Sequence, residues 1–216
     1  STNGGQALEQ IGWDVHVDHH AFCFQPGQPT RILLGNDGGL YRTTNNGNVW
    51  TFQTGLPINQ FYAISVDPQL PQRKYGGTQD NGTLRTVTGG TSDWQNILGG
   101  DGFYVLVDPT NSNRIYAEYQ WGTLSRSTDG GISFDYCMDG IEWSERTNWS
   151  TPIAMDPIEE NVLYYGAERI YRTTNSADSW NPISPDLTDG GGTGNLTFGT
   201  ITTIGISIIN RQVIWA

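Results

Sequence analysis

The sequence predicts an all-β fold, a β-propeller of four-stranded antiparallel blades, because three markers recur together along the chain. The first is an eight-residue segment with a hydroxyl side chain, Asn or Asp two positions later, Gly after two more, and an aromatic residue at the eighth position. The second is a proline seven residues before an apolar position, and the third is an arginine directly before the segment. Markers that keep phase over about 40 residues indicate repeated units, each with the strands of one propeller blade.

Copies of the eight-residue segment start at positions 1, 43, 86, 127 and 173. The copy at 173–180 has Ala177 in place of Gly, the copy at 1–8 ends in Leu8, and the copy at 86–94 is one residue longer. We expect each copy to form a tight β-hairpin in which the polar side chains bind the turn backbone and the aromatic residue packs beneath. The residues predicted to build these structural hairpins are Ser1, Asn3, Gly5, Thr43, Asn45, Gly47, Trp50, Thr86, Gly90, Trp94, Ser127, Asp129, Gly131, Phe134, Thr173, Asn175 and Trp180.

The other two markers keep the same phase. The prolines are Pro26, Pro68, Pro109 and Pro157, the apolar positions seven residues later are Leu33, Tyr75, Tyr116 and Tyr164, and the arginines are Arg42, Arg85, Arg126 and Arg172. One unit therefore reads as apolar strand, proline turn, apolar strand, Gly-rich link, short strand ending in Arg, hairpin and last strand. That order predicts four antiparallel strands per unit.

About five blade-length units follow from this order. We expect a partial unit at 1–13, full units at 14–55, 56–96, 97–139 and 140–189, a Gly-rich link at 190–194, and a partial unit with two strands at 200–216. The 140–189 unit carries an insertion around 141–149. Two arrangements remain open: the terminal pieces share one blade of a closed ring, or the chain is a fragment of a longer propeller, which we favour.

The amino-acid composition argues against some classes of binding partner. A formal net charge of −11 argues against nucleic acid or an anionic membrane surface as a partner. The longest apolar runs are too short for a membrane span, so no membrane insertion is expected. One Lys beside eight Trp and ten Tyr suits a secreted or cell-surface protein that faces carbohydrate. Cys23 and Cys137 could form a disulfide only if they are neighbours in space, and two buried free thiols are an equal expectation.

The first strand of each blade borders the central channel, so alternate residues of these strands are candidate ligand contacts. The predicted ligand-binding residues are His16, Asp18, His20, Gln60, Tyr62, Asp80 and Phe103. If His16, Asp18 and His20 share one face of a strand, they could bind a transition metal. The alternative is a polar channel lining that is hydrogen-bonded to water and to neighbouring strands.

Acidic residues among glycines follow the second strand of the early units. These runs are 35–39 and 77–82, which contain Asp37 and Asp80, and a similar run at the channel edge, 99–102, contains Asp101. Such carboxylates could bind calcium or face a sugar, although the same residues are also ordinary turn formers. No cofactor is required by these motifs, and calcium is an ion that they could bind.

The eight-residue pattern resembles the Asp-box, or BNR repeat, of sialidases, sortilin-type receptors and two-domain xyloglucanases. The resemblance implies that the hairpins lie on outer strands, away from the ligand-binding face. The runs 16–42, 60–62, 77–82 and 100–102 are similar to large secreted bacterial Asp-box proteins, labelled sortilin-like or glycosyl-hydrolase-like, and this similarity covers essentially the whole chain. Such labels describe the fold better than the activity.

The resemblance to two-domain xyloglucanases includes one position that is catalytic in those enzymes. Residues 36–42 are similar to a strand-end motif that carries a catalytic Asp, which matches Asp37 alone, and the second acid of those enzymes belongs to another propeller domain. The sialidase arginine triad and its nucleophilic Tyr have no match.

Two hypotheses about function follow from this pattern. The favoured one is a non-enzymatic, secreted or surface-attached binding or scaffold module with an extracellular glycan or protein ligand. The remaining blades of a longer chain, or a neighbouring subunit, are expected partners as well. The alternative is a glycoside hydrolase with Asp37 and Asp101 as paired carboxylates. We favour the first because the sequence offers no clear acid/base pair.

Overall fold

The computed structural model describes residues 1, 3–56, 58–188, 190 and 198–216. The chain divides into two compact units, Ser1–Ile58 and Asn59–Ala216, and each is described by itself. Of the predicted Gly-rich link at 190–194, only Gly190 lies within the described residues. No helix in the described part of the chain is long and apolar enough to cross a membrane.

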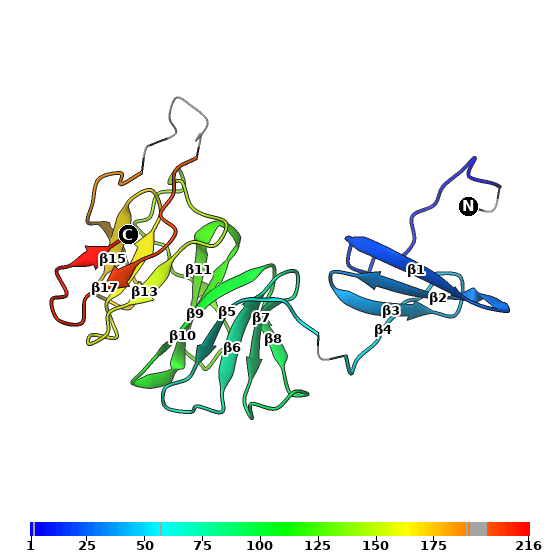
Figure 1. Cartoon of the computed structure of the whole chain (residues 1–216), viewed down its shortest axis with the longest axis horizontal. Helices are drawn as coiled ribbons and strands as arrows, with labels where there is room; N and C mark the ends of the chain where they lie inside the picture. The colour runs from blue at the N-terminus through cyan, green and yellow to red at the C-terminus, as the bar shows by residue number, and fades with distance from the viewer. Residues whose placement is uncertain (2, 57, 189, 191–197) are drawn as a thin grey trace. The chain divides into compact units, whose positions relative to one another are not determined.

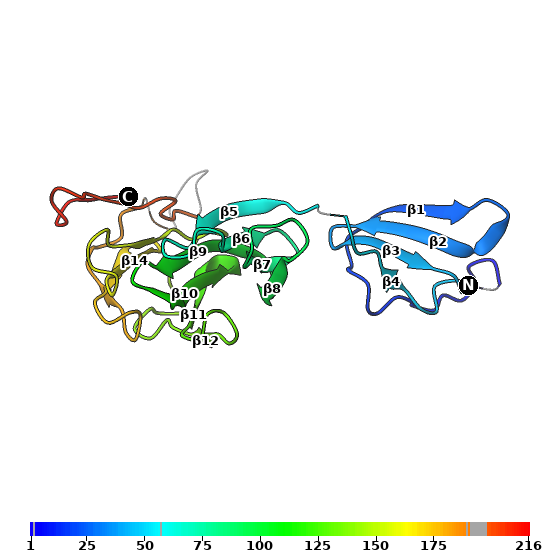
Figure 2. The same cartoon turned by 90° about the horizontal axis from the view of Figure 1, so that it is seen from below.

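The first unit holds one four-stranded sheet in which sequential strands pair (Figures 1 and 2). Its strands are β1 (His19–Gln25), β2 (Gln28–Asn36), β3 (Gly39–Thr43) and β4 (Thr51–Phe52), all antiparallel. The proline marker lies in the β1–β2 turn, and residues 43–50 connect β3 to β4. This order of strands and turns is the one predicted from the repeat.

The second unit holds three further four-stranded sheets and one two-stranded sheet. The strands are β5 (Phe61–Val66), β6 (Lys74–Thr78), β7 (Gly82–Thr86), β8 (Gln95–Leu98), β9 (Gly102–Asp108), β10 (Asn111–Tyr119), β11 (Thr123–Ser127), β12 (Asp135–Tyr136), β13 (Ile153–Met155), β14 (Leu163–Gly166), β15 (Ile170–Thr173), β16 (Asn181–Pro182), β17 (Gly205–Ile206) and β18 (Ile214–Trp215). The prediction of an all-β fold with four-stranded antiparallel blades is confirmed. The boundary predicted at residue 96 is two residues early, because β8 continues to Leu98.

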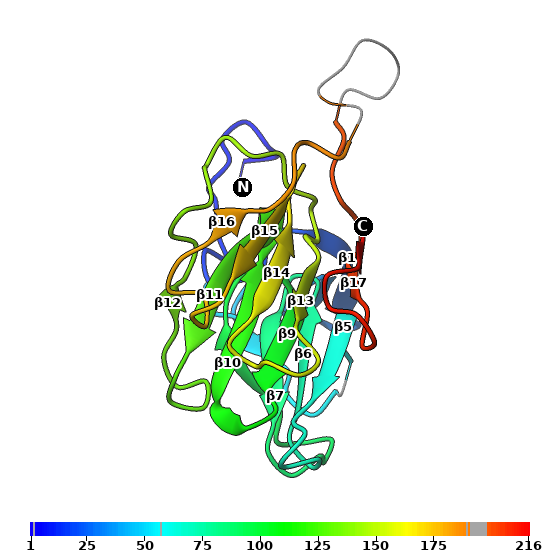
Figure 3. The ribbon, with the colours of Figure 1, turned by 90° about the vertical axis from the view of Figure 1, so that its left-hand side faces the viewer.

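The core of the second unit lies between successive sheets (Figure 3). One cluster joins the β9–β12 sheet to the β13–β16 sheet through Tyr116, Leu124, Leu163, Tyr165 and Trp180, each no more than 2% exposed. These side chains alternate along their strands with residues of the other face, as the period of a strand requires. The β9–β12 blade therefore buries residues against the sheets on both of its sides.

The eight-residue segments, called repeat hairpins below, form the predicted side-chain hydrogen bonds. Thr43 Oγ1 accepts from the backbone N–H of Asn45 at 3.3 Å and of Gly47 at 3.0 Å, and Asn45 Oδ1 accepts from Val49 N–H at 3.0 Å. The hairpins at 1–8, 127–134 and 173–180 repeat this set. The hydroxyl and the Asx side chain thus satisfy turn N–H groups that have no partner in the sheet.

The hairpin at 86–94 departs from the prediction. Gly89, not Gly90, has positive φ and donates its N–H to Thr86 Oγ1 at 2.9 Å. Asp93 accepts from the Thr86 hydroxyl at 2.7 Å and from Thr88 N–H at 3.0 Å, and these bonds, led by the Thr86 hydroxyl, lower the pKa of Asp93 to about 2. The extra residue moves the carboxylate to the far side of the turn, so the predicted role of Gly90 is wrong.

Both cysteines are free thiols, Cys23 exposed on β1 and Cys137 buried after β12. The expectation of two buried thiols therefore fails for Cys23. The Cys137 carbonyl accepts the Trp180 indole N–H at 2.8 Å. Burial raises the pKa of the Cys137 thiol to about 12.

Candidate functional site

In the second unit, the predicted ligand residues gather at one end of the blades. Because strands alternate in direction, the starts of first and third strands lie at the same end as the stops of second and fourth strands. Gln60, Tyr62 and Phe103 lie at or beside the starts of β5 and β9, while Asp80 lies in the β6–β7 turn. The repeat hairpins connect third to fourth strands, so they occupy the opposite end.

Asp101 is part of the framework at this end. Its side chain is buried, with the residue only 8% exposed, and Oδ1 accepts the Asp80 backbone N–H at 2.8 Å. A parallel bridge joins it to Gly82, and the Gln60 carbonyl accepts the Gln79 N–H at 3.0 Å. The carboxylate thus ties the β6–β7 turn to the start of the next blade.

Tyr62 and Phe103 stack with ring centroids 4.8 Å apart and an interplanar angle of 20°. Phe103 is fully buried, whereas Tyr62 is 41% exposed. The strands approach this closely because position 77 is glycine, where a Cβ atom would lie 2.2 Å from the backbone of Phe103. Two of the predicted ligand-binding residues are therefore in direct contact, and burial keeps Phe103 itself from meeting a ligand.

Three aromatic residues that the sequence did not single out extend this pair. Trp149 contacts Phe103 at 5.6 Å between centroids, Trp121 contacts Trp149 at 5.1 Å, and Phe198 contacts Trp121 at 6.4 Å. We call Tyr62, Phe103, Trp149, Trp121 and Phe198 the aromatic strip. Trp149 is 37% exposed, Trp121 52% and Phe198 55%, so the strip offers ring surface to solvent. The sequence did contain a signal for these three residues. Each of them lies just before or just after a predicted strand, at the end of the blade where ligand-binding residues were expected.

Trp121 is held in an unusual backbone conformation. It lies in the short 3₁₀ turn Gln120–Gly122 between β10 and β11, with φ 59° and ψ 33°. A bulky residue in the left-handed region costs about 1–3 kcal/mol and persists only where its surroundings impose it. Its N–H donates to the Trp149 carbonyl at 3.2 Å, and the Gly122 carbonyl accepts the Tyr165 hydroxyl at 3.0 Å. The fold therefore holds an exposed indole in place at a cost in stability.

Glu118 is fully buried at the end of β10, beside the segment that carries Trp149. Its carboxyl accepts the backbone N–H of Thr151 and, at 3.2 Å, that of Tyr104. The Thr151 hydroxyl donates in turn to the Asn148 carbonyl at 2.8 Å. Burial raises the pKa of Glu118 to about 8, although the two backbone hydrogen bonds lower it. Glu118 is out of reach of a ligand and acts by positioning the Trp149 segment.

The first unit contains Asp37 and all three histidines. His20 Nε2 contacts Asp37 Oδ1, His16 Nδ1 lies 3.7 Å from Asp18 Oδ2, and the Asp37 N–H donates to the Asp18 carbonyl at 3.3 Å. Because β1 begins at His19, His16 and Asp18 precede the strand and the alternation argument for a shared face does not hold. Strand alternation therefore does not support a shared face, although ligand atoms of His16 and Asp18 lie within 4.8 Å of each other. Metal binding and calcium binding both stay predictions.

The two carboxylates predicted as a catalytic pair have different surroundings. Asp37 has a side chain 34% exposed and a histidine partner in the first unit. Asp101 is a buried backbone acceptor in the second unit. The Asp37 side chain is thus partly exposed, while Asp101 is buried and holds a turn.

Comparison with proteins of known structure supports the assignment of the fold. No family model matches the chain. A solved structure of an ancestral GH74 enzyme superposes with a TM-score of 0.50 and 20% identity, covering 80% of this chain and 25% of that one. The chain has a β-propeller fold. YCF48 from Cyanidioschyzon merolae superposes at a TM-score of 0.44 and 17% identity, covering 92% of this chain and 62% of that one.

Among curated proteins, a xyloglucanase of Hypocrea jecorina (strain QM6a) is 30% identical over 199 residues. The match covers 79% of this chain but only 22% of the relative. The propeller therefore spans about a fifth of the length of the relative it matches.

Proposed function

We propose that this propeller is a secreted or cell-surface module that binds a glycan on its aromatic strip and does not itself cleave it. The observation that carries the proposal is Trp121, which is 52% exposed and held in a strained left-handed conformation. Strained, exposed aromatic residues at a face built from loop residues suit ligand binding better than packing. The similarity to a protein named xyloglucanase supports carbohydrate as the ligand class.

The strip has the chemistry that sugar rings need. The apolar C–H faces of a pyranose can lie against Trp121 and Phe198, while sugar hydroxyls remain in water at the edges of the rings. Covering two or three partly exposed rings contributes about 1–2 kcal/mol each. A dissociation constant between roughly 0.04 and 30 mM for a short oligosaccharide follows from that sum of about 2–6 kcal/mol.

The carboxylates favour binding over hydrolysis. Glycosidases place two carboxyl groups about 5–10 Å apart with access to the sugar. Asp101 is buried and accepts a turn N–H, so it supports the blade edge and is poorly placed to meet a substrate. Glu118 has a raised pKa, as a general acid would, but both of its oxygens face backbone N–H groups within the core.

Glycoside hydrolysis is the second candidate, and Asp37 is the observation that favours it. Its carboxylate is accessible and contacts His20, which could exchange its proton. In this reading the second carboxyl group comes from another propeller domain, as the resemblance of residues 36–42 implies. Asp37 then acts as one member of a pair that the two domains complete.

One experiment separates the two candidates. The full chain is run through gels that contain xyloglucan, other β-glucans or mannan, and reducing-end release is measured on the same polysaccharides. We expect retardation by at least one polysaccharide, no release, and at least a fivefold weaker retardation for Trp121→Ala. Trp143→Ala is the matched control, because Trp143 is 86% exposed and lies outside the strip.

Two results would contradict the binding proposal. Retardation that is equal in wild type and Trp121→Ala would remove the strip as the binding face. Reducing-end release that disappears in Asp37→Asn would make the propeller part of a hydrolase.

A further inference from the structure

Arg146 lies in the insertion at 141–149 and uses all three nitrogens of its guanidinium group. Nη1 lies 2.8 Å from Glu168 Oε2, and Nη2 lies 2.6 Å from Asp186 Oδ2. Nε donates to the Gly199 carbonyl at 3.2 Å. One side chain therefore joins the insertion to three other segments of the second unit.

The Gly199 carbonyl directly follows Phe198, the last ring of the aromatic strip. Phe198 is 55% exposed, and its ring contact in the described chain is with Trp121. A side chain with so few apolar neighbours is not fixed by packing alone. A second hydrogen bond holds the same segment, since Asn148 Nδ2 donates to Thr200 Oγ1 at 3.1 Å. Polar contacts from the insertion therefore fix the backbone that carries Phe198.

The segments around Arg146 approach one another closely, which requires glycine at position 199. A Cβ atom there would lie 2.7 Å from Thr188 Oγ1. The Thr188 hydroxyl accepts from Arg146 Nη2 at 3.1 Å and donates to Asp186 Oδ1 at 2.7 Å. The bonds from the Thr188 hydroxyl and from Arg146 lower the pKa of Asp186 to about 2. Asp186 therefore stays charged opposite Arg146 at neutral pH.

Phe198 lengthens the surface on which a sugar chain can lie. Its ring centroid is 6.4 Å from that of Trp121, which is 5.1 Å from that of Trp149. A pyranose ring covers about one aromatic ring, so a single sugar cannot cover both Trp121 and Phe198. The contribution of Phe198 to binding therefore depends on the length of the glycan chain.

We propose that Arg146 is a positioning residue of the aromatic strip. Through the Gly199 carbonyl it holds Phe198 beside Trp121, and the strip thereby favours long glycan chains over short ones. The inference rests on the proposed binding of a glycan by the strip. Two observations carry it: the bond from Arg146 to the residue next to Phe198, and the exposure of Phe198 itself.

The first measurement needs no ligand. The full chain is prepared with fluorotryptophan at its eight tryptophans, and the fluorine NMR signal of Trp121 is assigned with Trp121→Phe. Phe198→Ala is expected to move this signal, because the two rings are in contact. Arg146→Ala is expected to move it in the same direction, because the Phe198 segment is released. A Trp121 signal that stays in place in either variant would overturn the positioning role.

The second measurement tests the preference for long chains. Wild type and Arg146→Ala are titrated by calorimetry with cellobiose and cellohexaose, or with mannobiose and mannohexaose if mannan gives the stronger retardation. We expect Arg146→Ala to bind the hexasaccharide about fivefold to tenfold more weakly, as the loss of one ring contact predicts, and the disaccharide equally well. No loss for the hexasaccharide, or the same loss for both lengths, would overturn the length preference.

A double variant shows whether Arg146 acts through Phe198. Once Arg146→Ala is present, adding Phe198→Ala is expected to weaken hexasaccharide binding no further, because both changes remove the same contact. Losses that add in the double variant would show that Arg146 acts by another route.

Arg146→Lys separates positioning from stability. Lysine keeps a cation between Glu168 and Asp186, but its one nitrogen replaces three, so the bond to Gly199 is lost. We expect this variant to melt like wild type and yet to show the fluorine shift and the weaker hexasaccharide binding of Arg146→Ala. Wild-type behaviour in both readouts would overturn the role of the Gly199 bond.

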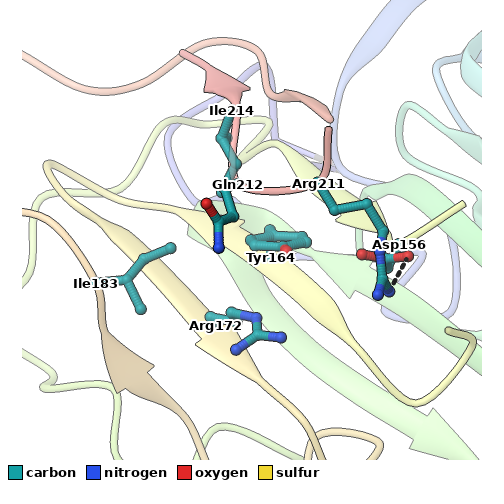
Figure 4. Close-up of a pocket in the computed structure, with 7 residues that line it drawn as sticks. All are labelled: Asp156, Tyr164, Arg172, Ile183, Arg211, Gln212 and Ile214. Carbon is teal, nitrogen blue, oxygen red and sulfur yellow. Dashed lines mark hydrogen bonds and ion pairs between the residues drawn. The ribbon is translucent and has the colours of Figure 1, made fainter. Parts of the chain in front are cut away.

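Arg211→Ala is the matched control for the loss of an arginine. Arg211 also pairs with two carboxylates, Asp156 and Glu159, in the pocket drawn in Figure 4. Asp156 lies in the β13–β14 turn, at the end of the blades away from the strip. We expect the Trp121 signal and the hexasaccharide affinity to stay unchanged. The same effects in Arg211→Ala and Arg146→Ala would show a general loss of stability and overturn the proposal.

The failure of the proposed function is distinguishable from the failure of this inference. If wild type binds neither oligosaccharide, the strip is not a glycan-binding face, and the length preference is overturned with it. The fluorine signal of Trp121 decides in either case whether Arg146 holds Phe198 in place.

Discussion

Arg126 and Arg172 occupy equivalent positions in successive blades, yet the same substitution is expected to destabilise the protein by different amounts at the two sites. Arg126→Ala removes a charged hydrogen bond to the Ser176 carbonyl and an ion pair to Asp178 at 2.7 Å. A hydrogen bond with a charged donor contributes about 1.5–3 kcal/mol. The ion pair adds less than 1 kcal/mol because the Asp178 side chain is 63% exposed. We therefore expect Arg126→Ala to lower the free energy of unfolding by about 2–3 kcal/mol.

Arg172→Ala removes no hydrogen bond of the described chain. What it loses is a cation–π contact at 6.0 Å, which contributes no more than about 0.5–1 kcal/mol at such a site. Urea unfolding followed by tryptophan fluorescence measures both variants. With a slope of about 2 kcal/mol per molar urea, the Arg126→Ala midpoint moves by about 1 M and that of Arg172→Ala by less than half as much.

The comparison is between equivalent positions of two repeats of the same chain, so differences in local strand geometry have little influence. Equal destabilisation by the two substitutions would refute the reasoning, since it would mean that Arg172 already has a structural partner. No destabilisation by Arg126→Ala would refute it as well, because the Arg126 contacts with Ser176 and Asp178 would then contribute nothing to the packing of one blade on the next.

Three further predictions follow. Trp50→Ala and Trp180→Ala are expected to cost about 3–5 kcal/mol each by thermal or urea unfolding, because both indoles are buried; wild-type melting of both would contradict their packing role. Burial raises the pKa of Glu118 to about 8 in the native state, against 4.5 in the unfolded chain. Between these pH values the native protein keeps a proton on Glu118 that the unfolded chain has lost. The free energy of unfolding is therefore expected to fall as the pH rises from 4.5 to 8. Thermal melts between pH 6 and pH 9 measure this loss of stability, and the Glu118→Gln variant is expected to remove most of it. If the variant loses as much stability as the wild type, other groups cause the pH dependence. A thiol reagent is expected to modify Cys23 within minutes and Cys137 only in denaturant, as mass spectrometry can check, and two fast thiols would contradict the burial of Cys137.

Much of the fold could be predicted because its markers are local. The repeat hairpins depend on hydrogen bonds between residues two to four positions apart, such as Thr43 with Asn45 and Gly47. Interactions over so short a span are visible in the sequence as fixed spacings. The one hairpin that was predicted wrongly, at 86–94, fails because an inserted residue changes which carboxylate can reach the turn, here Asp93.

The candidate site could be predicted only in part. Tyr62 and Phe103 follow from the register of first strands, and the structure brings them into contact. The separate roles of Asp37 and Asp101 do not follow, because both occur in similar Gly-rich runs. Burial alone distinguishes them, and burial depends on the neighbouring blade.

The sequence by itself determined the strand order, the blade length and the positions of the hairpins, since each is encoded within one repeat of about 40 residues. Only the tertiary structure decided what the repeat markers do across blades. It alone shows that Arg126 reaches the next hairpin and that Trp121 and Trp149 join Phe103 in one strip. The physical reason is the same in each case. These contacts join residues of different repeats, and their geometry depends on how one blade packs against the next.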